Sequence, residues 1–234
     1  IFKFIINMLQ LFIEIIESQF KTILFQLIFA TRFTLYLTAI TFVFGGIAGI
    51  FICYARLVSN IYFNYLSTAY IWLFQSVPLL MLLFLTGLGV PKLLGLYVDP
   101  WLAVTICFTL FSSAYLSEVW RGAFLAVSKN QWEGGYSIGL NFYQLLILII
   151  MPQALKFSIG PTFGFLVQLI KGTSLAYIIG FTDLMLIGKR WANSPVIGSE
   201  PYIVFPMMAF IYFILCFPLT RLSIYFEKKY KNLN

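Results

Sequence analysis

The chain has 234 residues, of which 61% are hydrophobic and 10% are charged, and its mean hydropathy is +0.94. Soluble domains carry about 25% charged residues, so this composition excludes a single soluble core and predicts a protein that a bilayer solvates. The formal net charge of +7 would suggest a nucleic-acid partner in a soluble protein. In a membrane protein the positive-inside rule explains that charge, and no nucleic-acid partner is expected.

The residue types that bind metals or form disulfides are few and scattered. The chain has no His, and Cys53, Cys107 and Cys216 lie far apart within apolar segments. We expect these cysteines to be small packing residues rather than parts of a metal or disulfide site. No small-residue cleavage site follows the first apolar segment, so a signal peptide is not predicted.

Residues 1–22 are apolar but carry four charged side chains, including the closely spaced Glu14 and Glu17. Apolar residues recur there at near-helical spacing, and two neighbouring acids are costly in hydrocarbon. The pattern predicts a helix in the membrane interface rather than a full span. The first full span is predicted at residues 33–54, where Gly45 and Gly49 lie on a small-residue face that favours close helix contact.

The second span is predicted at residues 61–85 and has a polar interruption in its middle. Gln75 and Ser76 precede Pro78, which removes a backbone donor and frees a carbonyl within the membrane. The kink either faces protein or water and is functional, or it is an ordinary proline kink of a span. The sequence leaves both interpretations open.

The third span, residues 100–117, leads into a polar segment at residues 117–139 that we call the elbow. A polar, partly helical segment between two spans is a place where a soluble partner can bind a membrane protein. The fourth span, residues 142–170, is broken by Pro152 and ends at Lys171. A lysine between apolar segments either marks a substrate or ion route or extends its ammonium to the interface.

A second polar region at residues 181–201 precedes the last span at residues 202–222. Five spans place the two chain ends on opposite sides of the membrane. One side then holds seven basic residues and the opposite side six, a modest bias, and we predict that the side with seven is cytoplasmic, with the N-terminus outside and the C-terminus inside. The seven are Arg56, Arg121, Lys129, Arg221, Lys228, Lys229 and Lys231, and the six are Lys3, Lys21, Arg32, Lys92, Lys189 and Arg190.

The elbow and the start of the fourth span resemble the EAA loop of bacterial ABC importer permeases. The family pattern is Glu-Ala-Ala, three residues, Gly, nine residues, Ile, one residue, Leu-Pro. This chain reads Glu133-Gly134-Gly135, three residues, Gly139, nine residues, Ile149, one residue, Met151-Pro152. Two glycines in place of the alanines lower the helix propensity by about 1 kcal/mol each.

Further motifs resemble the polar amino-acid branch of this superfamily, which serves His, Glu, Gln, Arg and opine transport. They cover nearly the whole chain from Phe33 to Glu227 and occur in the family's order. They are Ser76-Val77-Pro78-Leu79, Ser113-Ala114-Tyr115 with Glu118, Arg121-Gly122, Gln131-Trp132-Glu133, Ile138-Gly139-Leu140, Pro152-Gln153-Ala154-Leu155 and Lys171-Gly172-Thr173-Ser174-Leu175.

The resemblance implies an all-α, polytopic membrane protein of about five transmembrane helices with the type I importer permease (MetI-like) fold. The transmembrane domain would occupy residues 23–230, with a coupling helix at about residues 129–141. Such a chain is a transporter subunit of the bacterial cytoplasmic (inner) membrane, not an enzyme. Its implied partners are a second permease protomer in a homo- or heterodimer, an ATP-binding subunit at the elbow and an extracytoplasmic solute-binding protein.

The chain has no G-x-x-x-x-G-K-[ST] loop for phosphates, so ATP and Mg²⁺ are expected on the partner ATPase and no cofactor on this chain. The resemblance makes Glu133 the docking acid and Gly139 the turn after the coupling helix. Taken alone, Glu133 would be a solvated helix charge. Trp132 is either a lipid-headgroup anchor or a packing or ATPase contact. The implied coupling residues are Gln131, Trp132, Glu133, Gly134, Gly135, Gly139 and Leu140.

The resemblance also places a small polar substrate site in the middle of the membrane, although some family members have no such pocket. The ammonium of Lys171 and nearby hydroxyls would hold the carboxylate of an amino acid. Many relatives have Asp where this chain has Gly172, so a neutral or acidic polar L-amino acid such as glutamine or glutamate is expected. The implied substrate residues are Ser76, Val77, Pro78, Leu79, Glu118, Lys171, Thr173 and Ser174.

Two other function classes fit the sequence less well. A standalone channel or ion-coupled carrier usually needs ten or more spans or two repeats, with an acid at mid-membrane. An integral-membrane enzyme needs a cluster of acid–base or nucleophilic groups. The spans predicted here are too few for the former, and the residues form no motif for the latter. The permease subunit of an ATP-driven amino-acid importer is therefore the preferred hypothesis.

Overall fold

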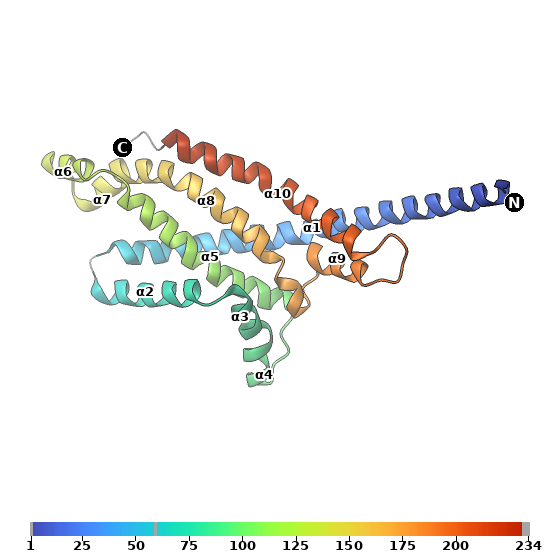
Figure 1. Ribbon diagram of the computed structural model, residues 1–234. Helices are drawn as coiled ribbons and strands as arrows, with labels where there is room; N and C mark the ends of the chain where they lie inside the picture. The colour runs from blue at the N-terminus through green and yellow to red at the C-terminus, as the bar shows by residue number, and fades with distance from the viewer. Residues whose placement is uncertain (1, 59, 231–234) are drawn as a thin grey trace.

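The computed structural model describes residues 2–58 and 60–230, without the side chains of residues 2–13, 15 and 16. Within these ranges every regular element is a helix, and the long helices lie roughly along one direction (Figure 1). The all-α fold expected from the sequence is confirmed. The elements are α1 Phe2–Leu57, α2 Ile61–Ser76, α3 Leu79–Phe84, a π-helical turn Leu85–Gly89, α4 Val90–Leu94, α5 Pro100–Leu125, α6 Lys129–Ser137, α7 Phe142–Leu145, a second π-helical turn Leu146–Ile150, α8 Met151–Thr173, a 3₁₀ turn Ala176–Ile179, α9 Leu184–Ala192 and α10 Pro201–Tyr230.

Four helices of the described chain are long and apolar enough to cross a membrane by themselves. The number reaches the expected five if the pair α2 and α3–α4, which bends by 100°, counts as one span. The sequence predicted a kink at Pro78, and in the structure the helix is interrupted there; we call the pair α2 and α3–α4 the broken span. The single helices run over Glu17–Leu57, Pro100–Leu125, Phe142–Ile179 and Pro201–Tyr230.

The first helix is much longer than a span requires. At 1.5 Å per residue, α1 is about 84 Å long, whereas hydrocarbon is about 30 Å thick. Its N-terminal part extends beyond the rest of the molecule (Figure 1). Residues 2–22 are helical and run without a break into the first span, because no Gly or Pro separates them from residues 33–54. Their position in the membrane interface stays a prediction, and most of their side chains lie outside the described part of the chain.

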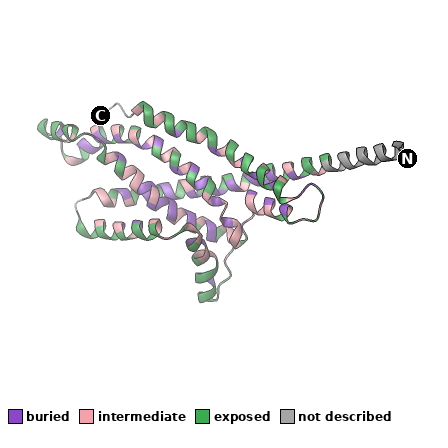
Figure 2. Cartoon of the chain, in the orientation of Figure 1, coloured by how far each residue is buried: buried purple, intermediate pink, exposed green. Residues whose placement is uncertain are grey.

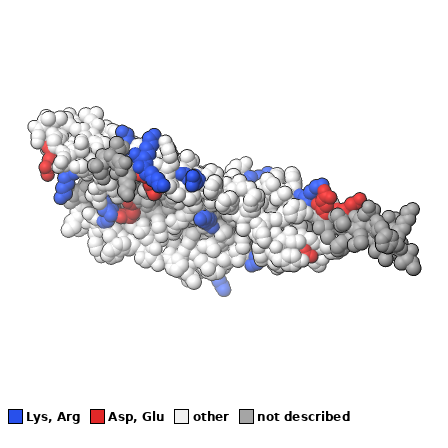
Figure 3. All heavy atoms as spheres, turned by 45° about the horizontal axis from the view of Figure 1, so that its top comes forward, with Lys and Arg blue, Asp and Glu red and all other residues white. Residues whose placement is uncertain are grey.

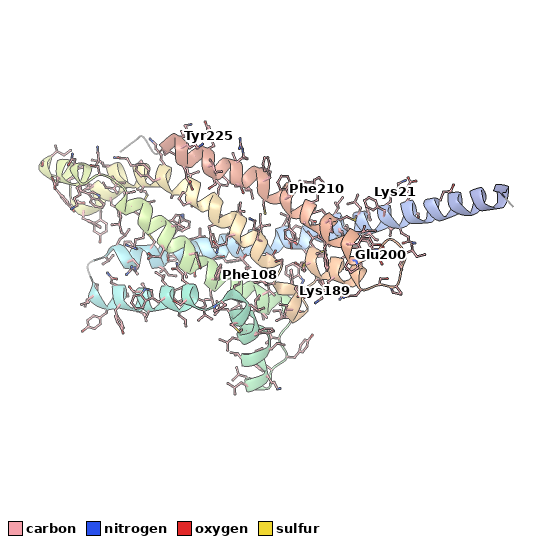
Figure 4. The ribbon with its side chains drawn as sticks, in the orientation of Figure 1. Lys21, Phe108, Lys189, Glu200, Phe210 and Tyr225 are labelled. Atoms are coloured by element: carbon pink, nitrogen blue, oxygen red, sulfur yellow. The ribbon has the colours of Figure 1, made fainter. Side chains whose placement is uncertain are left out.

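The core of the bundle lies where α5 packs between α1 and α8. Buried residues are concentrated on α5, whereas α2 and α10 show long exposed faces (Figure 2). Phe108 on α5 is fully buried and packs in one cluster with Leu37 of α1 and Leu169 of α8. Exposed aromatic side chains on α10, such as Phe210 (Figure 4), suit contact with lipid in a chain of this composition.

Close contact between α1 and α5 depends on the small-residue face predicted from the sequence. A Cβ atom added at Gly45 would collide with Ser112 and lie 3.1 Å from the carbonyl oxygen of Thr109. At Gly49 it would lie 3.2 Å from the carbonyl oxygen of Ser113. The prediction that these glycines permit close helix packing is confirmed.

The third span is longer than the sequence indicated. The elbow was expected to begin at Ser117, but α5 continues to Leu125. Glu118 and Arg121 form an ion pair of 2.6 Å one turn apart, so their charges compensate each other on the helix. Both residues therefore lie on a span, and the segment between spans begins only after Leu125.

The two ends of the molecule differ in what they carry. Helices α6 and α7 lie at one end together with the last turns of α10, while α9 and the N-terminus lie toward the other (Figure 1). Lys and Arg side chains gather over the α6 end (Figure 3), where α10 contributes the exposed Arg221, Lys228 and Lys229.

Candidate coupling helix and substrate site

The coupling candidate, α6, is a short helix with both ends fixed by local signals. Ser128 caps its N-terminus by accepting a hydrogen bond of 3.3 Å from the backbone N–H of Asn130. After the helix, Gly139 has φ +83, a left-handed conformation that favours glycine. A capping box between Asn141 and Gln144 then starts α7. The helix begins at Lys129 as expected and ends at Ser137.

One side of α6 is packed on the bundle. Trp132 is half-buried and stacks on Phe142, with 6.4 Å between ring centroids. Trp132 and Leu140 both pack against the buried cluster that includes Leu145. A Cβ atom at Gly135 would collide with the side chain of Leu145, so this glycine allows α6 to lie close to the second π-helical turn. Trp132 therefore contributes packing in this structure.

The other side of α6 is open. Glu133 and Gly134 are exposed, and a Cβ atom at Gly134 would meet no heavy atom within 4 Å. Gln131 is also exposed and accepts a hydrogen bond of 3.3 Å from Gln153 at the start of α8. The structure thus brings the seven predicted coupling residues into one short helix and its following turn. Trp132, Gly135 and Leu140 hold the helix, and Gln131, Glu133 and Gly134 are presented outward.

The second candidate region lies where the broken span meets the end of α8. Val77 is extended, with φ −86 and ψ 129, because the residue before a proline is disfavoured in the helical region. A Cβ atom at Gly172 would lie 3.2 Å from Leu79 and 3.4 Å from Phe108. The residues around Pro78 and those around Lys171 therefore approach each other beside the core of the bundle.

The polar groups of this region differ in their availability. The side chains of Ser76 and Lys171 are exposed. Thr173 is fully buried and donates to the carbonyl of Ile170 at 2.7 Å. Ser174 donates to the carbonyl of Lys171 at 2.7 Å. Lys171 is thus the charged group that this region offers, and the two hydroxyls mainly close the end of α8.

Glu118 lies nearer the α6 end of the bundle than Gly172 does. It lies ten residues after Phe108 on α5, which is about 15 Å along the helix axis. Its carboxylate faces Arg56 and Arg121 at the α6 end of the bundle. Glu118 is thus about 15 Å along α5 from the level at which Gly172 packs, whereas Gln75, beside Ser76, donates to the carbonyl of Ala114, one turn of α5 before Glu118.

A cavity at the same end of the bundle as Glu118 does not suit an amino acid. It has a volume of about 270 Å³, lies between α1, α5 and α8, and includes Cys53, Trp120 and Met151 in its lining. Almost all of its surface is apolar. A zwitterion would lose its hydration there without gaining hydrogen bonds.

Comparison with known proteins agrees with this architecture. Residues 41–232 match the family described as binding-protein-dependent transport system inner membrane component. The chain belongs to this family. It is similar to the L-cystine transport system permease protein TcyB of Bacillus subtilis, with 31% identity over 201 residues that cover 84% of this chain and 83% of that protein. It is also similar to the probable glutamine ABC transporter permease protein GlnM of Bacillus subtilis, with 32% identity over 166 residues that cover 71% of this chain and 75% of that protein.

Solved structures show the same fold for this permease. An amino acid ABC transporter crystallised with histidines superposes with a TM-score of 0.82 at 23% identity, covering 91% of the permease and 96% of that chain. The MetNI methionine ABC transporter superposes with a TM-score of 0.67 at 17% identity, covering 86% and 95%. The expected family and the type I, MetI-like permease fold are both confirmed.

The sequence reasoning missed one buried acid of the permease. Asp183 is fully buried, caps α9 by accepting from the N–H of Leu186 at 2.8 Å, and has a second carboxylate oxygen without a partner. Burial raises the pKa of Asp183, in the connection before α9, to about 6. An Asp directly before an apolar helical segment is a readable N-cap signal. Its role here is to fix the start of α9, which was expected to be part of an irregular polar region.

Proposed function

We propose that this amino-acid ABC transporter permease imports a neutral or acidic polar L-amino acid, such as glutamine or glutamate. The observations that carry the proposal are the exposure of Lys171 near the end of α8 and the approach of its neighbour Gly172 to Leu79 beside the break. An ammonium can bind the substrate carboxylate. The neighbouring Gly172 offers no acid to balance a cationic side chain. The relatives named for cystine and for glutamine transport support this substrate class.

We further propose that a partner ATPase, which holds ATP and Mg²⁺, docks on the outward side of α6 with Glu133 as the contacting acid. The exposure of Glu133 and the packing of Trp132 against Phe142 support this proposal, since an anchored helix can transmit force. A second permease protomer and a solute-binding protein on the opposite side complete the importer. Closure of the ATPases would move α6 and thereby open or close the site at Lys171.

The orientation that fits this scheme places α6 and the C-terminus in the cytoplasm of the bacterial cell and the N-terminus outside. The basic residues of the α6 end support it, because cytoplasmic segments carry an excess of Lys and Arg. The Lys189–Arg190 pair of α9 lies on the opposite side. Basic residues are therefore present on both sides, and their excess at the α6 end favours this orientation.

Uptake of labelled amino acids into vesicles with the co-reconstituted ATPase tests the substrate proposal. Lys171→Ala should reduce uptake at subsaturating substrate about ten- to a hundredfold, because a hydrogen bond to a charged group contributes about 1.5–3 kcal/mol. Lys171→Arg should retain part of the uptake. Lys156→Ala removes another exposed lysine of α8 and should leave uptake unchanged.

Equal uptake by the Lys171→Ala and Lys156→Ala variants would contradict the substrate site. A preference for arginine over glutamine in the wild-type vesicles would contradict the substrate class. Uptake by vesicles that contain the chain without any ATPase would show a standalone carrier, and the importer proposal would then be wrong.

A further inference from the structure

A cluster of charged and polar side chains joins three helices at the α6 end of the bundle. Glu118 on α5 accepts two hydrogen bonds from Arg121, of 2.9 and 2.6 Å. The same carboxylate lies 3.4 Å from Nε of Arg56 at the end of α1. Arg56 donates to Asn64 at 2.7 Å and to Thr68, both on α2. The carboxylate of Glu118 thus connects α5 to α1 and, through Arg56, to α2.

This cluster is partly removed from solvent, which strengthens its interactions. The side chains of Arg56 and Glu118 are only 17% and 25% exposed. Two guanidinium groups share one carboxylate, and loss of that carboxylate would leave like charges facing each other. Such a partly buried pair resists separation far more than an exposed surface pair does.

The cluster also lies between α6 and the broken span along the chain of contacts that α5 and α2 make. Only residues 126–128 separate α5 from α6, and Glu118 is seven residues, or about 10 Å, before the end of α5. On the other side of the cluster, α2 runs to the break at Val77. Along its length α2 is bonded to α5, since the hydroxyl of Tyr70 lies 2.6 Å from that of Ser113.

We propose that Glu118 is a positioning residue for transport, which couples movement of α6 to movement of α2 and the break at Pro78. This inference rests on the proposed docking of an ATPase at α6. Through Arg56, the Glu118 carboxylate makes α5 and the connection between α1 and α2 move as one body. Its role is then energetic coupling rather than contact with the amino acid.

Charge exchange separates this role from local helix stability. The double variant Glu118→Arg with Arg121→Glu keeps an ion pair within α5 but places a guanidinium opposite Arg56. Adding Arg56→Glu restores attraction between α1 and α5. The matched control exchanges the exposed pair Glu17 and Lys21, which is 2.7 Å apart at the other end of α1.

The readout is substrate transported per ATP hydrolysed in vesicles, together with the apparent KM and the melting temperature. The double variant should transport about tenfold less per ATP, within the usual range of coupling between sites, with its KM unchanged. The triple variant should recover to within about twofold of wild type, and the control should match wild type throughout. Arg56→Gln, which keeps polar contacts to α2 but loses the charge, should also uncouple transport if the double variant does not fold.

The proposal would be overturned if the double variant, or folded Arg56→Gln, transported as much substrate per ATP hydrolysed as the wild type does. A folded triple variant that stays uncoupled would do so too. A raised KM with an unchanged ratio would assign Glu118 to substrate binding instead. If the wild-type protein did not import substrate in the same vesicles, the proposed function itself would be wrong. If the wild type imports and only the predicted effect of the variants is absent, this inference alone is wrong.

Discussion

Two neighbouring glycines of α6 have opposite surroundings, and this difference explains what each contributes. Gly135 is buried, and its missing side chain leaves room for Leu145. Gly134 faces outward, with no heavy atom within 4 Å of a Cβ atom placed there. Gly135 is therefore required by packing, whereas Gly134 only lowers the helix propensity of α6.

Alanine substitutions should separate these two effects. Gly134→Ala should stabilise α6 by about 0.8–1 kcal/mol, because alanine is the better helix former. Gly135→Ala should destabilise the permease by about 1–3 kcal/mol, because the fully buried Leu145 must move. Thermal unfolding of the two purified variants in one detergent measures the difference. Equal melting temperatures would show that α6 does not depend on its contact with Leu145.

At the scale of elements, the pair α1 and α5 determines how closely the bundle packs. No hydrophobic driving force acts between helices inside lipid, so association depends on backbone approach and van der Waals contact. Gly45 faces the backbone of α5, and this backbone cannot rotate away as a side chain can. A Cβ atom at the next residue, Gly46, would lie 3.5 Å from the ring of Trp120 and 3.9 Å from the side chain of Leu116, which are ordinary contacts.

We therefore expect Gly45→Ala to weaken the bundle and Gly46→Ala to leave it unchanged. The added methyl group at position 45 forces α1 away from α5 and should cost about 1–3 kcal/mol. The fraction of protein that stays monodisperse after solubilisation, and its melting temperature, report this loss. The prediction fails if the two alanine variants behave alike.

For the molecule as a whole, the sequence predicted what depends on composition and local signals. Apolar segment lengths indicated five spans, and the spacing from Glu133 to Pro152 predicted the short helix that the structure shows as α6. The sequence did not predict that α5 continues beyond Ser117, because an unpaired charge such as that of Glu118 is costly within a span. Glu118 is paired with Arg56 of α1, and this contact between two helices cannot be read from the sequence. The 100° bend at Pro78 was predicted only as a kink, since its angle depends on packing by other helices.

The candidate site shows the same limit. The order of motifs along the chain placed Glu118 and Lys171 in one set, but a helix carries consecutive motifs to different depths. Ten residues of α5 separate Glu118 from the level of Phe108, where Gly172 packs. Which side chains of different helices meet is decided by tertiary packing, which single-chain patterns do not contain.

The orientation of the whole molecule is the last prediction. Tyr97, in the connection before α5, is 92% exposed, and Ser137 at the end of α6 is exposed at the opposite end. Tyr97→Cys should react with a membrane-impermeant maleimide in intact cells, and Ser137→Cys only in inverted membrane vesicles, because the basic residues of the α6 end favour a cytoplasmic position for that end. The native chain is a suitable control, since Cys53, Cys107 and Cys216 are 4%, 1% and 6% exposed. Labelling of Ser137→Cys in intact cells would place the coupling helix outside, where no cytoplasmic ATPase can reach it.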